Sequence, residues 1–226
     1  MTTKHEAKLA DGRDLFYFDD AGSRLTAERA NDTRPAEPRP ELAEMRLDVL
    51  SGEWISVAAH RHGRAFLPPA HECPLCPSHE GFASELPDNF DVAVFENRNP
   101  SFAQVAGTVD DKNYWVEPTL PLGVTKPSIG RCEVVVFSPE HEGSLASQSL
   151  TRIRTILDAL ADRTDAILRM PGVRTVFPFE NRGQEIGVTL HHPHGQIYAY
   201  PYVTPTQEKV FASIARHGKD LFQDIL

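Results

Sequence analysis

Apolar residues recur with a helical period in one long stretch of the second half of the chain. Between residues 147 and about 170 the apolar positions are Leu150, Ile153, Ile156, Leu157, Leu160, Ile167 and Leu168. This spacing is typical of an amphipathic helix, and Pro171-Gly172 ends it. A further helix is expected over residues 206–226, with Val210, Phe211, Ile214 and Leu221 on one side.

Shorter runs of β-branched, aromatic and alternating residues predict strands. They cover 45–50 and 54–59, joined as a hairpin at Ser51-Gly52, then 91–96, 132–137, 173–179 and 195–200. Strands joined by loops, with one long crossing helix, predict an α+β fold in which helices pack on one face of an antiparallel sheet.

Two stretches lack such periodicity. Residues 1–43 are polar and contain Pro35, Pro38 and Pro40, which favours a mobile arm that wraps over the domain. Residues 63–90 are rich in proline, glycine and cysteine, and we interpret them as a loop region that a metal ion would organise.

Composition narrows the class of protein. With 226 residues, 40% hydrophobic and 24% charged, the chain suits one ordinary soluble domain. It has no apolar run near the roughly 18 residues of a membrane span, and its first residues lack the apolar core of a signal peptide. A net charge of -9 argues against general nucleic-acid binding. Three cysteines, two of them in a Cys-x-x-Cys, indicate a reducing compartment, and we expect a cytoplasmic protein.

Candidate chemistry gathers around the last predicted strand. Side chains alternate between the two faces of a strand, so His192, His194 and Gln196 would share one face. Two imidazoles and an amide are costly to bury without partners. The arrangement makes sense if one histidine binds a metal, the next attacks an electrophile and the amide stabilises the developing charge.

A second candidate site is the pair Cys73 and Cys76. Their two-residue spacing lets both thiolates reach one tetrahedral ion. A redox pair is the alternative, but its usual βαβ context is absent and a proline-rich loop disfavours it. Two more ligands are needed, and His71 and His79 are the nearest histidines in the sequence.

Five ordered motifs between about residues 45 and 205 carry a family resemblance. They are Gly52-Glu53-Trp54-Ile55 with His60-Arg61-His62-Gly63-Arg64, Cys73-Pro74-Leu75-Cys76, Phe137-Ser138-Pro139-Glu140-His141, Phe179-Glu180-Asn181-Arg182-Gly183 and His192-Pro193-His194-Gly195-Gln196. This set resembles the galactose-1-phosphate uridylyltransferase family of the histidine-triad superfamily. Gln196 stands where the hydrolases of that superfamily carry a third histidine.

The resemblance implies a histidine-triad-like half-barrel and a zinc site made of Cys73, Cys76, His141 and His192. It implies that His194 attacks the α-phosphorus of UDP-glucose and then passes UMP to galactose 1-phosphate. In that scheme Gln196 donates to a phosphate oxygen, and the carbonyl of His192 fixes the tautomer of His194.

The resemblance also names substrate-binding residues. Arg61 and Arg64 match phosphate-binding arginines, although from the residues alone a solvated basic loop is an equal alternative. Asn181 and Thr189 match positions that bond the phosphates, and Asn97 matches one near the ribose. The next residue, commonly acidic in the family, is Arg98 here, which puts the ribose contact in doubt. The base pocket would contain Leu75, Phe95 and Phe179, each of which is equally a candidate core residue.

These assignments predict a nucleotidyltransferase domain over residues 44–205, with residues 206–226 beginning a second half that the family's longer proteins contain. The expected partners are the two substrates, together with a second copy of the chain or a separate C-terminal half. Two alternatives stay open. One is an adenylyl-transferring or phosphorolytic relative, and the other is a non-catalytic, zinc-bound nucleotide-binding domain.

Overall fold

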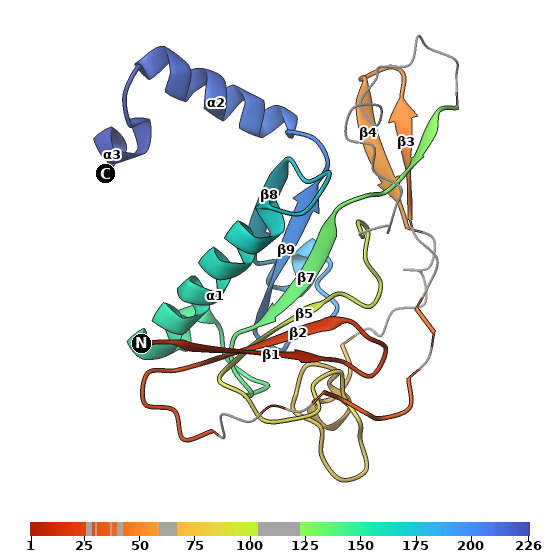
Figure 1. The fold of residues 1–226 in the computed structure, drawn as a ribbon, viewed down its shortest axis with the longest axis vertical. Coiled ribbons are helices and arrows are strands. Elements are labelled where there is room, and N and C mark those ends of the chain that lie inside the picture. Colours follow the sequence, from red (N-terminus) through yellow and green to blue (C-terminus); the bar gives the residue numbers. More distant parts are fainter. Residues whose placement is uncertain (26–28, 30, 37, 40–42, 59–66, 104–122) are drawn as a thin grey trace.

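A computed structural model describes residues 1–25, 29, 31–36, 38–39, 43–58, 67–103 and 123–226. Its centre is a six-stranded antiparallel sheet in the order β1-β2-β5-β7-β9-β8 (Figure 1). The strands are β1 (Thr3–Lys8), β2 (Asp14–Asp19), β5 (Val92–Glu96), β7 (Arg131–Val136), β9 (His194–Tyr200) and β8 (Thr175–Phe179). The predicted α+β class with an antiparallel sheet is therefore confirmed.

A second, three-stranded sheet contains the hairpin expected near residues 45–59. Strands β3 (Glu44–Asp48) and β4 (Glu53–Val57) pair with each other, and β6 (Thr125–Pro127) pairs with β3. Gly52 adopts the positive φ of 72° that the connecting turn requires. The sequence did not predict β6, which has only three residues.

Helix α1 (Leu150–Leu168) covers one face of the large sheet (Figure 1). The side chain of Ser149 caps it by accepting a hydrogen bond from the backbone of Arg152. Ile156, Ala159 and Ile167 pack into a core with β2, β5, β7 and β9. The predicted apolar stripe is only partly buried, because Leu150, Leu157 and Leu168 are exposed.

The expectation of a polar arm over residues 1–43 is wrong for its first half. Strands β1 and β2 occupy one edge of the large sheet, and β2 pairs with β5. The run Leu15-Phe16-Tyr17-Phe18 is buried on both faces, and a strand that is covered on both faces shows no alternation. Gly12 and Gly22 flank it, and these two glycines are the turn signals that mark the strand in the sequence.

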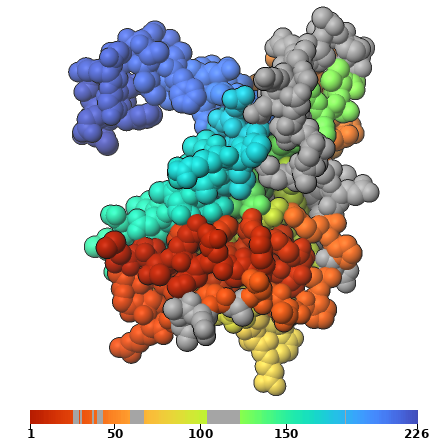
Figure 2. Space-filling model, in the orientation of Figure 1, coloured from red at the N-terminus to blue at the C-terminus, as the bar shows by residue number. Residues whose placement is uncertain are grey.

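The C-terminal segment forms two helices instead of the one expected. Helix α2 (Pro205–His217) ends where Gly218 takes a left-handed φ of 76°, and α3 (Leu221–Ile225) follows. Both lie away from the large sheet (Figures 1 and 2), and neither has a buried residue. Of the three α-helices that the structure describes, only α1 therefore packs on the sheet. Short 3-10 helices cover Ala70–Glu72, Leu145–Ser147 and Gln184–Ile186. No helix in the described ranges is both long and apolar enough to cross a membrane.

Candidate active site

The face of the large sheet opposite α1 carries a cavity of about 540 Å³. One row of paired strand residues crosses its floor, because Phe95 lies opposite Val134, Val134 opposite Gln196, and Gln196 opposite Phe179. All four side chains line the cavity. His194, two residues before Gln196 on β9, lines it as well.

Strand β9 places its residues by strict alternation. Gly195, Ile197 and Ala199 are buried, whereas His194, Gln196 and Tyr198 are partly exposed. The predicted shared face of His194 and Gln196 is therefore present. His192 lies just before the strand, and its ring is buried.

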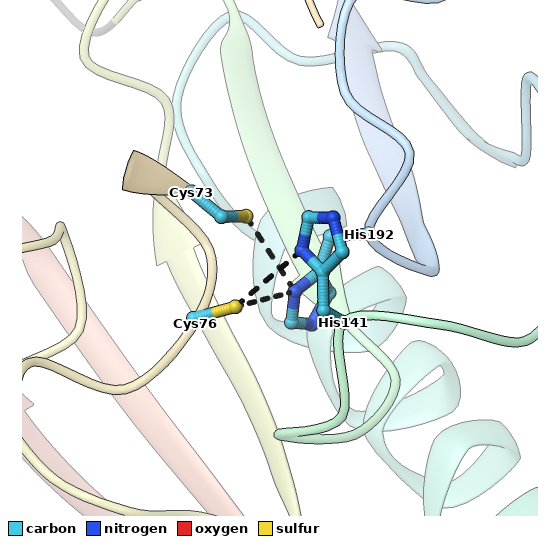
Figure 3. Close-up of side chains that lie close together, drawn as sticks. All are labelled: Cys73, Cys76, His141 and His192. Carbon is cyan, nitrogen blue, oxygen red and sulfur yellow. Dashed lines mark hydrogen bonds between the residues drawn. The ribbon is translucent and has the colours of Figure 1, made fainter. Parts of the chain in front are cut away.

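Cys73, Cys76, His141 and His192 converge from three separate segments of the chain (Figure 3). Their potential ligand atoms all lie within 4.8 Å of one another. His192 Nδ1 is 3.7 Å from Cys73 Sγ and 3.4 Å from Cys76 Sγ, and His141 Nδ1 is 3.6 Å from Cys76 Sγ.

These separations fit a tetrahedral metal site. Metal–sulfur bonds of about 2.3 Å and metal–nitrogen bonds of about 2.0–2.1 Å at tetrahedral angles separate sulfur from nitrogen by roughly 3.6 Å. The cluster can therefore hold one metal ion with two sulfur and two nitrogen ligands.

The surroundings of the cluster favour ligation in two further ways. His192 Nε2 donates to the carbonyl of Ser138 at 2.8 Å, which leaves Nδ1 to face the sulfurs. Burial lowers the pKa of His192 to about 4, so the ring is neutral at pH 7. Burial, together with the adjacent Cys73, raises the pKa of the Cys76 thiol to about 12, so a bound cation is needed to stabilise the thiolate pair.

His71 and His79, the histidines nearest to the cysteine pair in the sequence, do not belong to the cluster. His79 instead contacts two backbone carbonyls, those of Glu80 at 2.9 Å and His71 at 3.3 Å. Among the residues that the structure describes, the group of potential ligands contains His141 and His192 and excludes His71 and His79. The histidines distant in sequence thus complete the set.

The tautomer of His194 is fixed by its neighbour. Its Nδ1 lies 2.7 Å from the carbonyl oxygen of His192. A carbonyl only accepts, so Nδ1 carries the proton and Nε2 carries the lone pair of the neutral ring. His192 therefore acts on the cluster through its ring and on His194 through its backbone.

The cavity brings together every described residue that the sequence named for substrate binding. Besides Phe95, Phe179 and Gln196, its walls contain Leu75, Asn97, Asn181 and Thr189. The backbone N–H of Asn97 is anchored on the Cys132 carbonyl at 2.8 Å. Arg61 and Arg64 lie outside the described residues.

Sequence reasoning missed other lining residues. Tyr198 faces the cavity by the same alternation that places Gln196, so the period of two would have found it. Val134 lines the cavity opposite Gln196 on β7, a strand without alternation. Glu85 also lines it, held by an ion pair from the buried Arg13, and Arg98 lies 3.9 Å from the other Glu85 oxygen. Nothing in the sequence around Glu85 indicated this position.

Residues 34–204 match the family model described as the N-terminal domain of galactose-1-phosphate uridyl transferase. The chain belongs to this family. A galactose-1-phosphate uridylyltransferase of Streptomyces lividans is 42% identical over 99% of this chain and 57% of its own length. The Thermotoga maritima protein of the same name is 37% identical over 72% of this chain and 48% of its own length.

Solved structures agree with this assignment. A uridylyltransferase structure superposes with a TM-score of 0.59 at 30% identity, over 79% of this chain and 54% of that chain. The chain thus spans about half the length of the relatives that it matches.

Proposed function

We propose that this chain transfers UMP from UDP-glucose to galactose 1-phosphate through a uridylyl-His194 intermediate. The observation that carries the proposal is the 2.7 Å hydrogen bond from His194 Nδ1 to the His192 carbonyl. Because this bond places the proton on Nδ1, the lone pair of the neutral imidazole is on Nε2. The ring lines the cavity beside Gln196. A neutral imidazole is a competent nucleophile toward phosphorus.

The reaction then takes two balanced steps. His194 Nε2 attacks the α-phosphorus of UDP-glucose, the bond to the bridging oxygen breaks, and glucose 1-phosphate leaves with that oxygen. A phosphate oxygen of galactose 1-phosphate next attacks the same phosphorus, and His194 leaves with its lone pair restored. UDP-galactose is the product.

Phosphoryl transfer depends mostly on positioning and charge stabilisation. Gln196 shares the face of His194, so its amide donates to a non-bridging oxygen of the α-phosphate. Removing one such donor costs about 10²–10³ in rate. Asn181 and Thr189, in the same cavity wall, bond the phosphates, and Arg61 and Arg64 are proposed to add positive charge there.

The nucleoside occupies the part of the cavity toward β5. Phe95 lies on the floor there and Leu75 lies in the wall, which suits the planar, largely apolar faces of a base. Phe179, also expected in the base pocket, lines the same cavity from β8, and strands β7 and β9 separate it from Phe95. Asn97 is the proposed ribose contact, with Arg98 beside it in place of an acidic residue.

Zinc is the metal that the donor set of two cysteines and two histidines fits best. Cys73, Cys76, His141 and His192 would hold it as a structural ion. Bound there, it would join the Cys73–Cys76 loop to the segment that carries His194, and leave the chemistry to the imidazole. Thiolate ligands require reduced cysteines, which supports a cytoplasmic setting.

Trapping the intermediate tests the function. UDP-glucose labelled in its uridine part should leave acid-labile label on His194, because a phosphoramidate bond hydrolyses in acid. The same nucleotide sugar labelled in glucose should leave none, and ADP-glucose should label the protein far less. Absence of acid-labile uridine label on folded, zinc-loaded protein contradicts the proposal, and preferential labelling by ADP-glucose would favour the adenylyl-transferring alternative.

A second copy of the chain is proposed as a partner as well. Phe211 on α2 and Phe222 and Ile225 on α3 are more than half exposed, and such apolar patches commonly mark interaction surfaces. Sedimentation of the purified chain tests for the second copy, and a stable monomer at micromolar concentration would contradict self-association.

A further inference from the structure

Arg152 stands at a position where a helix does not favour a cation. It belongs to the first turn of α1, which contains no acidic residue. The positive end of the helix dipole lies there and disfavours positive charge. The local helix therefore gives no reason for an arginine at this position, and the explanation lies in its tertiary contacts.

Those contacts come from three other segments of the chain. Arg152 Nε donates to Asp20 at 3.0 Å, Nη2 donates to Asp91 at 2.7 Å, and Nη1 donates to the Phe137 carbonyl at 3.4 Å. The backbone N–H of Asp20 also donates to Asp91 at 3.0 Å. The side chains of all three charged residues are less than one-fifth exposed, so this is a shielded, organised cluster and not a solvated surface pair.

The Phe137 contact leads directly to the active-site histidines. The N–H of Phe137 donates to the Pro193 carbonyl at 3.1 Å, between the metal ligand His192 and the nucleophile His194. The next carbonyl, that of Ser138, accepts a hydrogen bond from His192 Nε2 at 2.8 Å. The backbone at residues 137–138 thus holds the histidine segment at two points, and Arg152 holds that backbone between them.

We infer that Arg152 is a positioning residue for the His192-Pro193-His194 segment, acting through the Phe137 backbone. Its carboxylate partners hold the guanidinium, and the third arm of the guanidinium fixes the end of β7. The fixed strand end keeps the His192 carbonyl against His194 Nδ1. The inference rests on the proposed function in that it takes His194 to be the nucleophile.

Replacing Arg152 with lysine distinguishes a positioning role of the side chain from simple charge neutralisation. Lysine keeps the positive charge beside Asp20 and Asp91, but an ammonium is a point charge and lacks the rigid three-way fork of arginine. Arg152→Lys should therefore remain folded and lose the contact to Phe137. Arg154→Lys is the matched control, because Arg154 is on the same helix and its exposed side chain pairs with Asp158, one turn away, at 3.0 Å.

Two measurements decide the case on the zinc-loaded chain. Imidazole ¹⁵N resonances report the His194 tautomer, and single-turnover labelling with uridine-labelled UDP-glucose reports its reactivity. We expect Arg152→Lys to give a mixture of Nδ1–H and Nε2–H tautomers. Its labelling rate at saturating nucleotide should fall between about 10-fold and 10²-fold, since a displacement on the order of 1 Å has effects of this size. The affinity for UDP and the melting temperature should stay near those of Arg154→Lys.

An unchanged tautomer together with an unchanged saturating labelling rate in Arg152→Lys would overturn the inference, because charge neutralisation would then account for Arg152 in full. If the wild-type chain takes no label, the proposed function fails, and the tautomer measurement alone still decides whether Arg152 positions His194.

Discussion

The two faces of the large sheet are filled in opposite ways. On the α1 face, aromatic and aliphatic side chains of β2, β5, β7 and β9 pack against Ile156, Ala159 and Ile167 with little exposed surface. Even the charges there are paired internally, since the buried Glu133 accepts two hydrogen bonds from Arg163. On the opposite face the sheet borders a cavity of about 540 Å³ and the Cys/His cluster.

This difference indicates that the α1 face serves mainly the stability of the fold and the cavity face mainly its chemistry. The buried cluster on the α1 face gives β9 a rigid support, because close-packed protein interiors resist deformation. The same strand then presents His194 and Gln196 on its other face, where open volume admits a ligand. Truncating an apolar side chain packed on the α1 face should therefore change the free energy of unfolding, whereas replacing a β9 side chain that faces the cavity should change reactivity.

The largest effect is expected at His194, the proposed nucleophile. His194→Gly should lower uridylyl-enzyme formation by about 10⁴-fold or more, as removal of a nucleophile does in other covalent catalysts. The melting temperature and the metal content should stay within error of the wild type, because the His194 ring borders a cavity and is not in the core. Persistent labelling by UDP-glucose would show that the nucleophile lies elsewhere.

Ile167→Ala should lower the stability of the fold and leave the reactivity of His194 unchanged. Ile167 is completely buried under the α1 face, and truncating such a side chain costs about 2–5 kcal/mol of unfolding free energy. Uridylyl-enzyme formation by the fraction that stays folded should be unchanged. Leu168→Ala is the matched control, since this neighbouring residue is 49% exposed and should cost much less in urea unfolding. Similar losses in the two variants would contradict the burial argument.

Cys73→Ser should lower stability only when zinc is present. A metal at a hundredfold excess over its dissociation constant stabilises the folded chain by about 3 kcal/mol, and the variant should lose most of this. Cys132→Ser is the control, because Cys132 is equally buried but lies outside the cluster. Metal analysis and melting curves with and without a chelator measure both effects. A folded wild-type chain that contains no zinc would exclude the site.

Much of the cavity face was predictable from the sequence. The alternation of His194 and Gln196, the Cys73–Cys76 spacing and the resemblance together named residues that the structure brings to one place. The position of His141 came from the resemblance and not from spacing, because ligands distant in sequence need only meet in space. The period of two also applied to Tyr198, which was overlooked.

The α1 face was harder to predict, for physical reasons. Strands β2, β5 and β7 are buried on both sides, so their residues show no alternation that would assign a face. Strand β2 was missed altogether within a stretch that looks polar on average. The ends of helices depended on local signals such as Gly218, whose left-handed conformation divides the C-terminal segment in two.

Gly195 lies on β9, the strand that both faces share. Of the substitutions tested, its replacement should have the smallest effects on stability and on the labelling rate. It lies between His194 and Gln196, but a Cβ atom there would point to the α1 side, 3.0 Å from the Phe137 ring and 3.2 Å from the Phe179 carbonyl. Gly195→Ala should therefore cost about 1–3 kcal/mol of stability through overpacking. It should also lower the labelling rate modestly, because the displaced Phe137 holds Pro193 through its N–H.

Combining Gly195→Ala with Phe137→Leu, which removes part of the ring, should restore some of both losses. If the double variant is as slow as the single one, the two faces do not communicate through Phe137.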